Sequence, residues 1–110
     1  MRFTVVLVLA FACQSSDVSR QVGARCDVSS ECDERCLGPD GNFPGGFCTI
    51  SCDHSSDCPD NAACVDDDGG ACLFRCLENT DCAFLGTGWA CKAESERGNS
   101  NVQVSVCAGG

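Results

Sequence analysis

The pattern of apolar and polar residues changes after the first twelve positions of the chain. Residues 1–12 contain one positive charge, followed by a short apolar run that ends in small residues. This run is too short to span a bilayer as a helix, and it is typical of a secretory signal peptide. Residues 13–25 begin with a cysteine and continue as a polar stretch with no apolar period, which predicts a flexible tether.

A first β-hairpin is predicted where two short apolar segments flank a turn. Residues 63–65 and 71–73 are the apolar segments, and the sequence between them is Asp-Asp-Asp-Gly-Gly at 66–70. Glycine supplies the positive φ that a tight reversal of the chain requires. Short apolar segments on both sides of such a turn are the usual signal of a hairpin.

Two further strands are predicted near the carboxyl end, at residues 89–92 and 102–106. Apolar valines alternate with polar residues in the second of these segments, which gives one apolar face. The intervening residues 94–101 are expected to form a loop. The glycine- and proline-rich residues 38–46 are also expected to be more loop than strand.

Cysteine spacing divides the rest of the chain into three units, at residues 26–48, 52–72 and 76–107. Each unit opens with two cysteines separated by five residues, and a Ser or Thr precedes an acidic residue in every opening. Short hydroxyl and carboxylate side chains bond nearby backbone N–H groups, so each opening is expected to be a tight turn or one helical turn. The match in spacing and chemistry indicates an internal repeat. The twelve cysteines of these units are Cys26, Cys32, Cys36, Cys48, Cys52, Cys58, Cys64, Cys72, Cys76, Cys82, Cys91 and Cys107.

Disulfide bonds are expected to hold this fold, because large apolar residues are scarce. Only fifteen large apolar residues other than cysteine lie between Cys26 and Cys107. This number is too small to predict one continuous hydrophobic core in a domain of this size. Six bridges would stabilise the chain by roughly 2–4 kcal/mol each. Such bridges persist only in an oxidising compartment, and spacing alone allows three pairings within each unit.

The net charge of −9 argues against nucleic acid and anionic membranes as partners. No run of lysine or arginine occurs in the sequence. The acidic residues are expected to form a solvated surface, and attraction of cations or basic partners is the alternative.

Cys13 follows the apolar segment directly, and of the thirteen cysteines it is the one that lies outside the three units. The stretch Leu9-Ala10-Phe11-Ala12-Cys13 resembles the processing site of bacterial lipoproteins. The resemblance implies cleavage before this cysteine and attachment of lipid to it. Ordinary signal-peptidase cleavage near the same place and a retained membrane anchor are the alternatives.

The order of cysteines within each unit, followed by a glycine-turned hairpin, resembles the front of an EGF-like module. The expected fold is therefore small and disulfide-rich, with three tandem EGF-like four-cysteine modules, short β-hairpins and little helix. The resemblance implies that the first cysteine of a unit pairs with the third and the second with the fourth. The implied bridges are Cys26–Cys36, Cys32–Cys48, Cys52–Cys64, Cys58–Cys72, Cys76–Cys91 and Cys82–Cys107.

Taken whole, the chain resembles the small cysteine-rich lipoproteins abundant in myxobacteria. The residues that carry this likeness are Phe43-Pro44-Gly45-Gly46-Phe47-Cys48-Thr49, Asp57-Cys58-Pro59 and Cys64-Val65. The resemblance implies a location in the cell envelope and brings no assigned activity.

Signals for metal, cofactor or catalytic chemistry are weak. No cysteine pair has the two-residue spacing typical of zinc or iron–sulfur sites, so neither a metal nor another cofactor is expected. The single histidine, His54, is expected to lie exposed in a polar turn rather than to serve a nucleophile. The acidic run at 66–68 lacks the alternation and distal Glu of a calcium loop. No catalytic residue is therefore predicted.

Aromatic residues among glycines are the candidates for binding loops. Phe43, Phe47, Phe84 and Trp89 are such residues, and exposed aromatics commonly anchor interfaces. In a scaffold with few apolar residues, however, such rings are more often packed against disulfides, and this is the favoured interpretation.

The sequence thus favours a non-enzymatic, lipid-anchored, extracytoplasmic module of the cell envelope, for binding or for structure. Its partners would be the membrane, through the lipid on Cys13, and an unknown protein or cell-surface partner. The alternative is a freely secreted disulfide-rich inhibitor or toxin-like effector.

Overall fold

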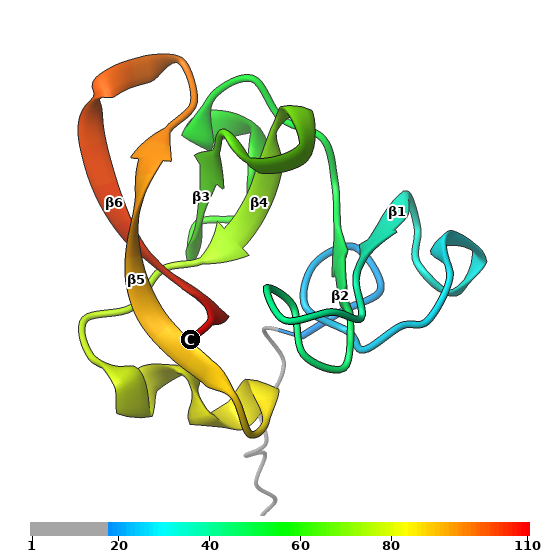
Figure 1. Cartoon of the computed structure of the whole chain (residues 1–110). Helices are drawn as coiled ribbons and strands as arrows, with labels where there is room; N and C mark the ends of the chain where they lie inside the picture. The colour runs from blue at the N-terminus through cyan, green and yellow to red at the C-terminus, as the bar shows by residue number, and fades with distance from the viewer. Residues whose placement is uncertain (1–17) are drawn as a thin grey trace, which may run out of the picture.

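The computed structural model describes residues 18–110, in which β-strands are interspersed with 3₁₀ turns (Figure 1). The predicted signal segment and Cys13 lie outside the described residues. The strands are β1 (Arg35–Leu37), β2 (Phe47–Thr49), β3 (Ala62–Val65), β4 (Ala71–Phe74), β5 (Trp89–Glu96) and β6 (Asn99–Gly109). The 3₁₀ turns are η2 (Ser29–Glu31), η3 (Ser55–Asp57), η4 (Asp67–Gly69) and η5 (Asn79–Leu85). The expectation of a small, disulfide-rich fold dominated by strands is confirmed.

The strands form two antiparallel sheets. Strands β1 and β2 make a two-stranded sheet in the first unit, on either side of the loop expected at residues 38–46. The other four strands form one sheet in the order β4-β3-β5-β6, which joins the second and third units (Figure 1). Strands β3 and β4 are the predicted hairpin, with Cys64 opposite Cys72.

The hairpin of β5 and β6 is longer than the sequence pattern predicts. Strand β5 continues to Glu96 and β6 starts at Asn99, so most of the loop expected at residues 94–101 is strand. Gly98 has a φ of +86°, which lets the chain reverse within two residues. The prediction of a loop there is wrong because the ends of both strands next to the reversal consist mostly of polar residues, which give no apolar alternation.

The predicted tether is also shorter than expected, because residues 18–25 pack on the domain. The backbone N–H of Gly23 donates to the carbonyl of Cys48 at 2.8 Å, and the N–H of Cys48 donates to the carbonyl of Ala24 at 2.8 Å. The side chain of Val22 is 1% exposed and belongs to the main core. The two valines of this segment, Val18 and Val22, are too few to define an apolar period, so hydrophobic patterning did not indicate this contact.

One hydrophobic core extends across all three units, contrary to the expectation of too few apolar residues. Phe47 of the first unit, Val65 of the second and Val106 of the third are each 0% exposed within it. Half-cystines and alanines supply much of the remaining buried surface. A count of large apolar residues missed this contribution, although cysteine is among the residue types most often fully buried.

Thr49 links the first unit to the second inside this core. Its hydroxyl accepts a hydrogen bond from the backbone N–H of Cys72 and donates to the Cys72 carbonyl, both at 2.9 Å. The side chain is 0% exposed, and these bonds satisfy its polar group. The second and third units are joined where Val65 of β3 pairs with Glu96 of β5.

Candidate functional site

Six disulfides join the twelve cysteines of the three units, two within each unit. In every unit the first cysteine pairs with the third and the second with the fourth, as the EGF-like resemblance implies. Their Cα–Cα distances are 5.4 to 6.0 Å, within the usual range for a disulfide. The bridges are Cys26–Cys36, Cys32–Cys48, Cys52–Cys64, Cys58–Cys72, Cys76–Cys91 and Cys82–Cys107.

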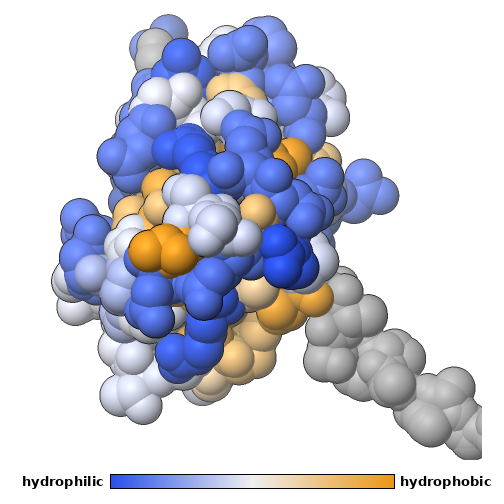
Figure 2. Space-filling view, turned by 90° about the vertical axis from the view of Figure 1, so that its right-hand side faces the viewer, coloured by the Kyte–Doolittle hydropathy of each residue, from blue (hydrophilic) through white to orange (hydrophobic). Residues whose placement is uncertain are grey.

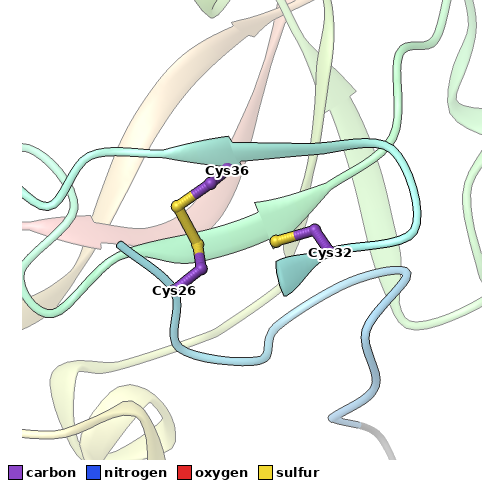
Figure 3. Close-up of side chains that lie close together, drawn as sticks. All are labelled: Cys26, Cys32 and Cys36. Atoms are coloured by element: carbon purple, nitrogen blue, oxygen red, sulfur yellow. A yellow bond between two sulfur atoms is a disulfide. The ribbon is translucent and has the colours of Figure 1, made fainter. Parts of the chain in front are cut away.

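The two bridges of a unit lie close together and bring sulfur atoms within metal-ligand spacing. Figure 3 shows this in the first unit, where Cys32 lies beside the Cys26–Cys36 bridge. The sulfurs of these three residues lie within 4.8 Å of one another. Cysteine binds a metal ion through its thiolate, whereas each of these cysteine sulfurs is already bonded to a second sulfur in a disulfide. These cysteines therefore stabilise the fold as disulfides rather than provide ligand atoms for a metal ion.

We expect alkylation of the native protein without reductant to label none of these twelve cysteines. The reason is that all of them are half-cystines in the structure. Intact mass before and after treatment with iodoacetamide measures the number of free thiols. Reduction before alkylation is the control and should add twelve labels. Two or more labels on the unreduced chain would contradict the structure.

The three unit openings share a turn in which a carboxylate accepts two backbone hydrogen bonds. The carboxylates belong to Glu31, Asp57 and Asp81, and each accepts from the residues three and four positions before it. The donor–acceptor distances are 2.6 to 3.4 Å. The expectation of a helical turn at each opening is confirmed by η2, η3 and η5.

A second side-chain hydrogen bond in each opening has no counterpart among the contacts predicted from the sequence. Ser29, Ser55 and Asn79 accept a hydrogen bond from the backbone N–H of the third cysteine of their unit, at 2.9 to 3.1 Å. These side chains lie one position before the Ser or Thr that the repeat emphasises. The available signal was that this position also holds a short polar residue in all three units.

The paired backbone N–H groups lower the pKa of Glu31, Asp57 and Asp81, because they stabilise the ionised carboxylates. A carboxyl with a lowered pKa in the folded state stabilises that state above its ordinary pKa. This stabilisation is lost as the pH falls through the lower, folded-state pKa. The ordinary pKa values are 4.5 for the glutamate and 3.8 for the two aspartates.

We therefore expect the melting temperature to fall as the pH is lowered below these ordinary values. The triple variant Glu31→Gln, Asp57→Asn, Asp81→Asn keeps an oxygen acceptor at each turn but cannot titrate there. Its melting temperature should depend less on pH in the same range, as followed by circular dichroism. The control Asp60→Asn removes one exposed carboxylate outside these turns, so the melting temperatures of the triple variant are compared with those of this variant at each pH. If the melting temperature of the triple variant depended on pH as that of the wild type does, these three carboxylates would not be the source of the pH dependence.

Three of the four aromatic candidates are buried, so they are not available as binding loops. Phe43, Phe47 and Trp89 are 4%, 0% and 7% exposed. The ring centroid of Trp89 lies 6.3 Å from that of Phe43 and 5.5 Å from that of Phe47. The indole N–H donates to the carbonyl of Pro44 at 3.0 Å. Their proposal as exposed anchors is wrong because these rings fill the core that a count of apolar residues did not predict.

Phe84 is the candidate that remains accessible, with 55% of its surface exposed. Its ring centroid lies 5.6 Å from that of Phe74, which holds one side of the ring against the core. A pocket of about 200 Å³ lies beside it. Its lining residues are Val18, Gly23, Arg25, Gly46, Phe84 and Leu85.

A shallower groove of about 440 Å³ lies between η5 and the start of β5. Asn79, Thr80 and Thr87 give it polar walls, and Trp89 contributes to its lining. The side-chain oxygen of Asn79 already accepts from the backbone of Cys91. The groove offers small polar groups and no pair of titratable side chains among its described lining residues.

One carboxylate of the acidic run at 66–68 is already engaged by an arginine side chain. Arg97 donates to the carboxylate of Asp66 at 2.9 Å and lies 3.7 Å from that of Asp53. Burial raises the pKa of Asp67, and the neighbouring carboxylates of Asp68 and Asp66 add to this effect. Burial and the charge of Asp67 likewise raise the pKa of Glu94. A nearby carboxylate engaged by arginine leaves fewer oxygens for a cation, which weakens the calcium interpretation further.

His54 lies at the start of η3 and is exposed, as expected. The neighbouring half-cystine, Cys52, is bonded to Cys64 and so has no thiol to act as a nucleophile. Within residues 18–110, no helix has the length and apolar character needed to span a membrane.

Comparison of the chain with family models, with curated proteins and with solved structures gave no match. The features of the chain that bear on its function are the six bridges, the exposed Phe84 and the position of Cys13 after the apolar segment.

Proposed function

We propose that this protein is a non-enzymatic binding or structural module of the cell envelope, anchored by lipid on Cys13. The single observation that supports this most is the division of the cysteines. Six disulfides account for twelve of the thirteen, and the remaining one directly follows the apolar segment at residues 1–12. Disulfides in this number are typical of an oxidising, extracytoplasmic compartment.

The described surface supports a binding or structural role over catalysis. Catalytic sites bring titratable or nucleophilic groups together in a concave site that excludes water. The two hollows described above are shallow or small, and glycine, short polar and apolar residues dominate their walls. Each unit opening instead uses its polar side chains to satisfy backbone groups, which fixes the turn.

The anchor is tested by replacing Cys13 with serine in the full chain. We expect the wild-type protein to be recovered with membranes and Cys13→Ser to be recovered in the soluble fraction or in the medium. The physical reason is that acyl chains supply the membrane affinity, at about 0.8 kcal/mol for each buried CH₂ group. Membrane fractionation followed by immunoblotting measures the distribution.

The control Ser16→Ala alters a polar residue near the same place and should fractionate as the wild type does. A Cys13→Ser protein that is processed normally and still stays with membranes would contradict the lipid anchor. A wild-type protein that leaves the cell without lipid would favour the secreted inhibitor or effector instead.

A further inference from the structure

An apolar patch lies beside the point where the described chain begins. The residues concerned are Val18, which is 37% exposed, and Phe84, which is 55% exposed. Both line the same small pocket, together with Arg25. Figure 2 shows hydrophobic residues next to the start of the described chain, on a surface that is otherwise largely hydrophilic. We call the surface of Val18, Arg25 and Phe84 the tether face.

The chain between Cys13 and this face is short. Val18 lies five residues after Cys13, and five fully extended residues reach roughly 17 Å. The following residues are held on the domain by the bonds of Gly23 and Ala24 with Cys48. A lipid on Cys13 would therefore keep Val18 within roughly 17 Å of the lipidated residue, which is close enough for the tether face to reach the bilayer surface.

The chemistry of the tether face suits a lipid surface. Phe is among the apolar residues that bury their side chains at the boundary between headgroups and acyl chains. Packing against Phe74 holds the Phe84 ring in place, so little side-chain freedom is lost when it inserts. The guanidinium of Arg25 lies close to Gly45 and Gly86, beside the same pocket, where it can meet a lipid phosphate.

The net charge of −9 opposes binding of a free domain to anionic lipid. A tether changes this balance, because it makes the second contact intramolecular and raises the effective concentration of the surface. The contact therefore depends on the lipid anchor, and so it rests on the proposed function.

We propose that the tether face rests on the phospholipid surface to which Cys13 is anchored, with the Phe84 ring in the interfacial layer. The domain then has a fixed orientation on the membrane. The reversal between β5 and β6 lies at the end of the molecule away from the start of the described chain, so it points into the aqueous space (Figure 1).

Photo-crosslinking of the full chain in its native membrane tests this orientation. The photoreactive residue p-benzoylphenylalanine is placed at position 84 or, as a matched control, at position 102. Val102 is also partly exposed, at 39%, but it lies on β6 near the distal reversal. After irradiation, mass spectrometry measures the fraction of each protein that carries covalently bound phospholipid. We expect severalfold more phospholipid on position 84 than on position 102.

Each result of this experiment has a distinct meaning, provided that both variants keep all twelve half-cystines unlabelled by alkylation. Membrane-bound variants with equal lipid labelling at the two positions would overturn the orientation and leave the anchor intact. More labelling at position 102 would overturn it in the same way. A wild-type protein absent from the membrane fraction would overturn the proposed anchor and, with it, this inference.

Discussion

Replacing both Cys82 and Cys107 with alanine is expected to lower the free energy of unfolding by about 3.5 kcal/mol. This bridge closes the longest loop of the six, with a sequence separation of 25 residues. A longer loop restricts the unfolded chain more strongly, so its removal returns more conformational entropy to that state. Both cysteines are also 0% exposed, and their sulfurs belong to the core. Thermal unfolding of the otherwise unreduced protein, followed by circular dichroism, measures the effect.

The matched control replaces Cys26 and Cys36, whose sequence separation is only 10 residues. The same chain-entropy relation gives about 2.7 kcal/mol for that shorter loop. We therefore expect the melting temperature to fall further for the Cys82/Cys107 variant than for the control. The reverse order would show that loop length does not decide the stabilisation here.

The second large effect is expected for Phe47→Ala, at about 3–5 kcal/mol. The ring of Phe47 is 0% exposed and lies 5.6 Å from the Phe74 ring and 5.5 Å from the Trp89 ring, measured between centroids. Phe74 ends strand β4 of the β3–β4 hairpin, and Trp89 lies in the third unit. The cavity left by the substitution would therefore border the first unit, this hairpin and the third unit. Trp89 is the only tryptophan of the chain, so its fluorescence during denaturant unfolding reports on the third unit.

Phe84→Ala is the control, because that ring is more than half exposed and its loss leaves a smaller cavity. We expect it to shift the unfolding midpoint much less than Phe47→Ala does. If Phe47→Ala left the unfolding of Trp89 unchanged, the three units would be energetically independent, and the shared core would not contribute to their stability.

Local features of the fold could be predicted from the sequence because they depend on neighbouring residues. The turn at each unit opening follows from short polar side chains that bond the adjacent backbone, as Asp57 does. The β3–β4 hairpin follows from apolar segments on both sides of a glycine turn. The implied pairing of cysteines also agrees with the structure, since each bridge stays within its unit.

Contacts between the units could not be predicted in the same way. Val22 joins the core from a polar segment, and Thr49 bonds the backbone of Cys72 across a sequence separation of 23 residues. Neither residue belongs to a repeating pattern, so only the folded arrangement reveals its role. For the same reason Phe43, Phe47 and Trp89 could be named only as candidates for binding loops, and the structure instead buries them, as the packed interpretation expects.

The arrangement of the bridges also determines what a single proteolytic cut can do. Within each unit the two bridges overlap along the sequence, so a cut anywhere between its first and last cysteine leaves both pieces covalently joined. Between the first and last cysteines of the chain, only the joints at residues 49–51 and 73–75 lack this protection. Both joints begin in paired strands, with Thr49 in β2 and Leu73 in β4, and both of these residues are 0% exposed. Proteases bind extended, accessible chain, so a protein that is cut within one of its units should persist as one molecule.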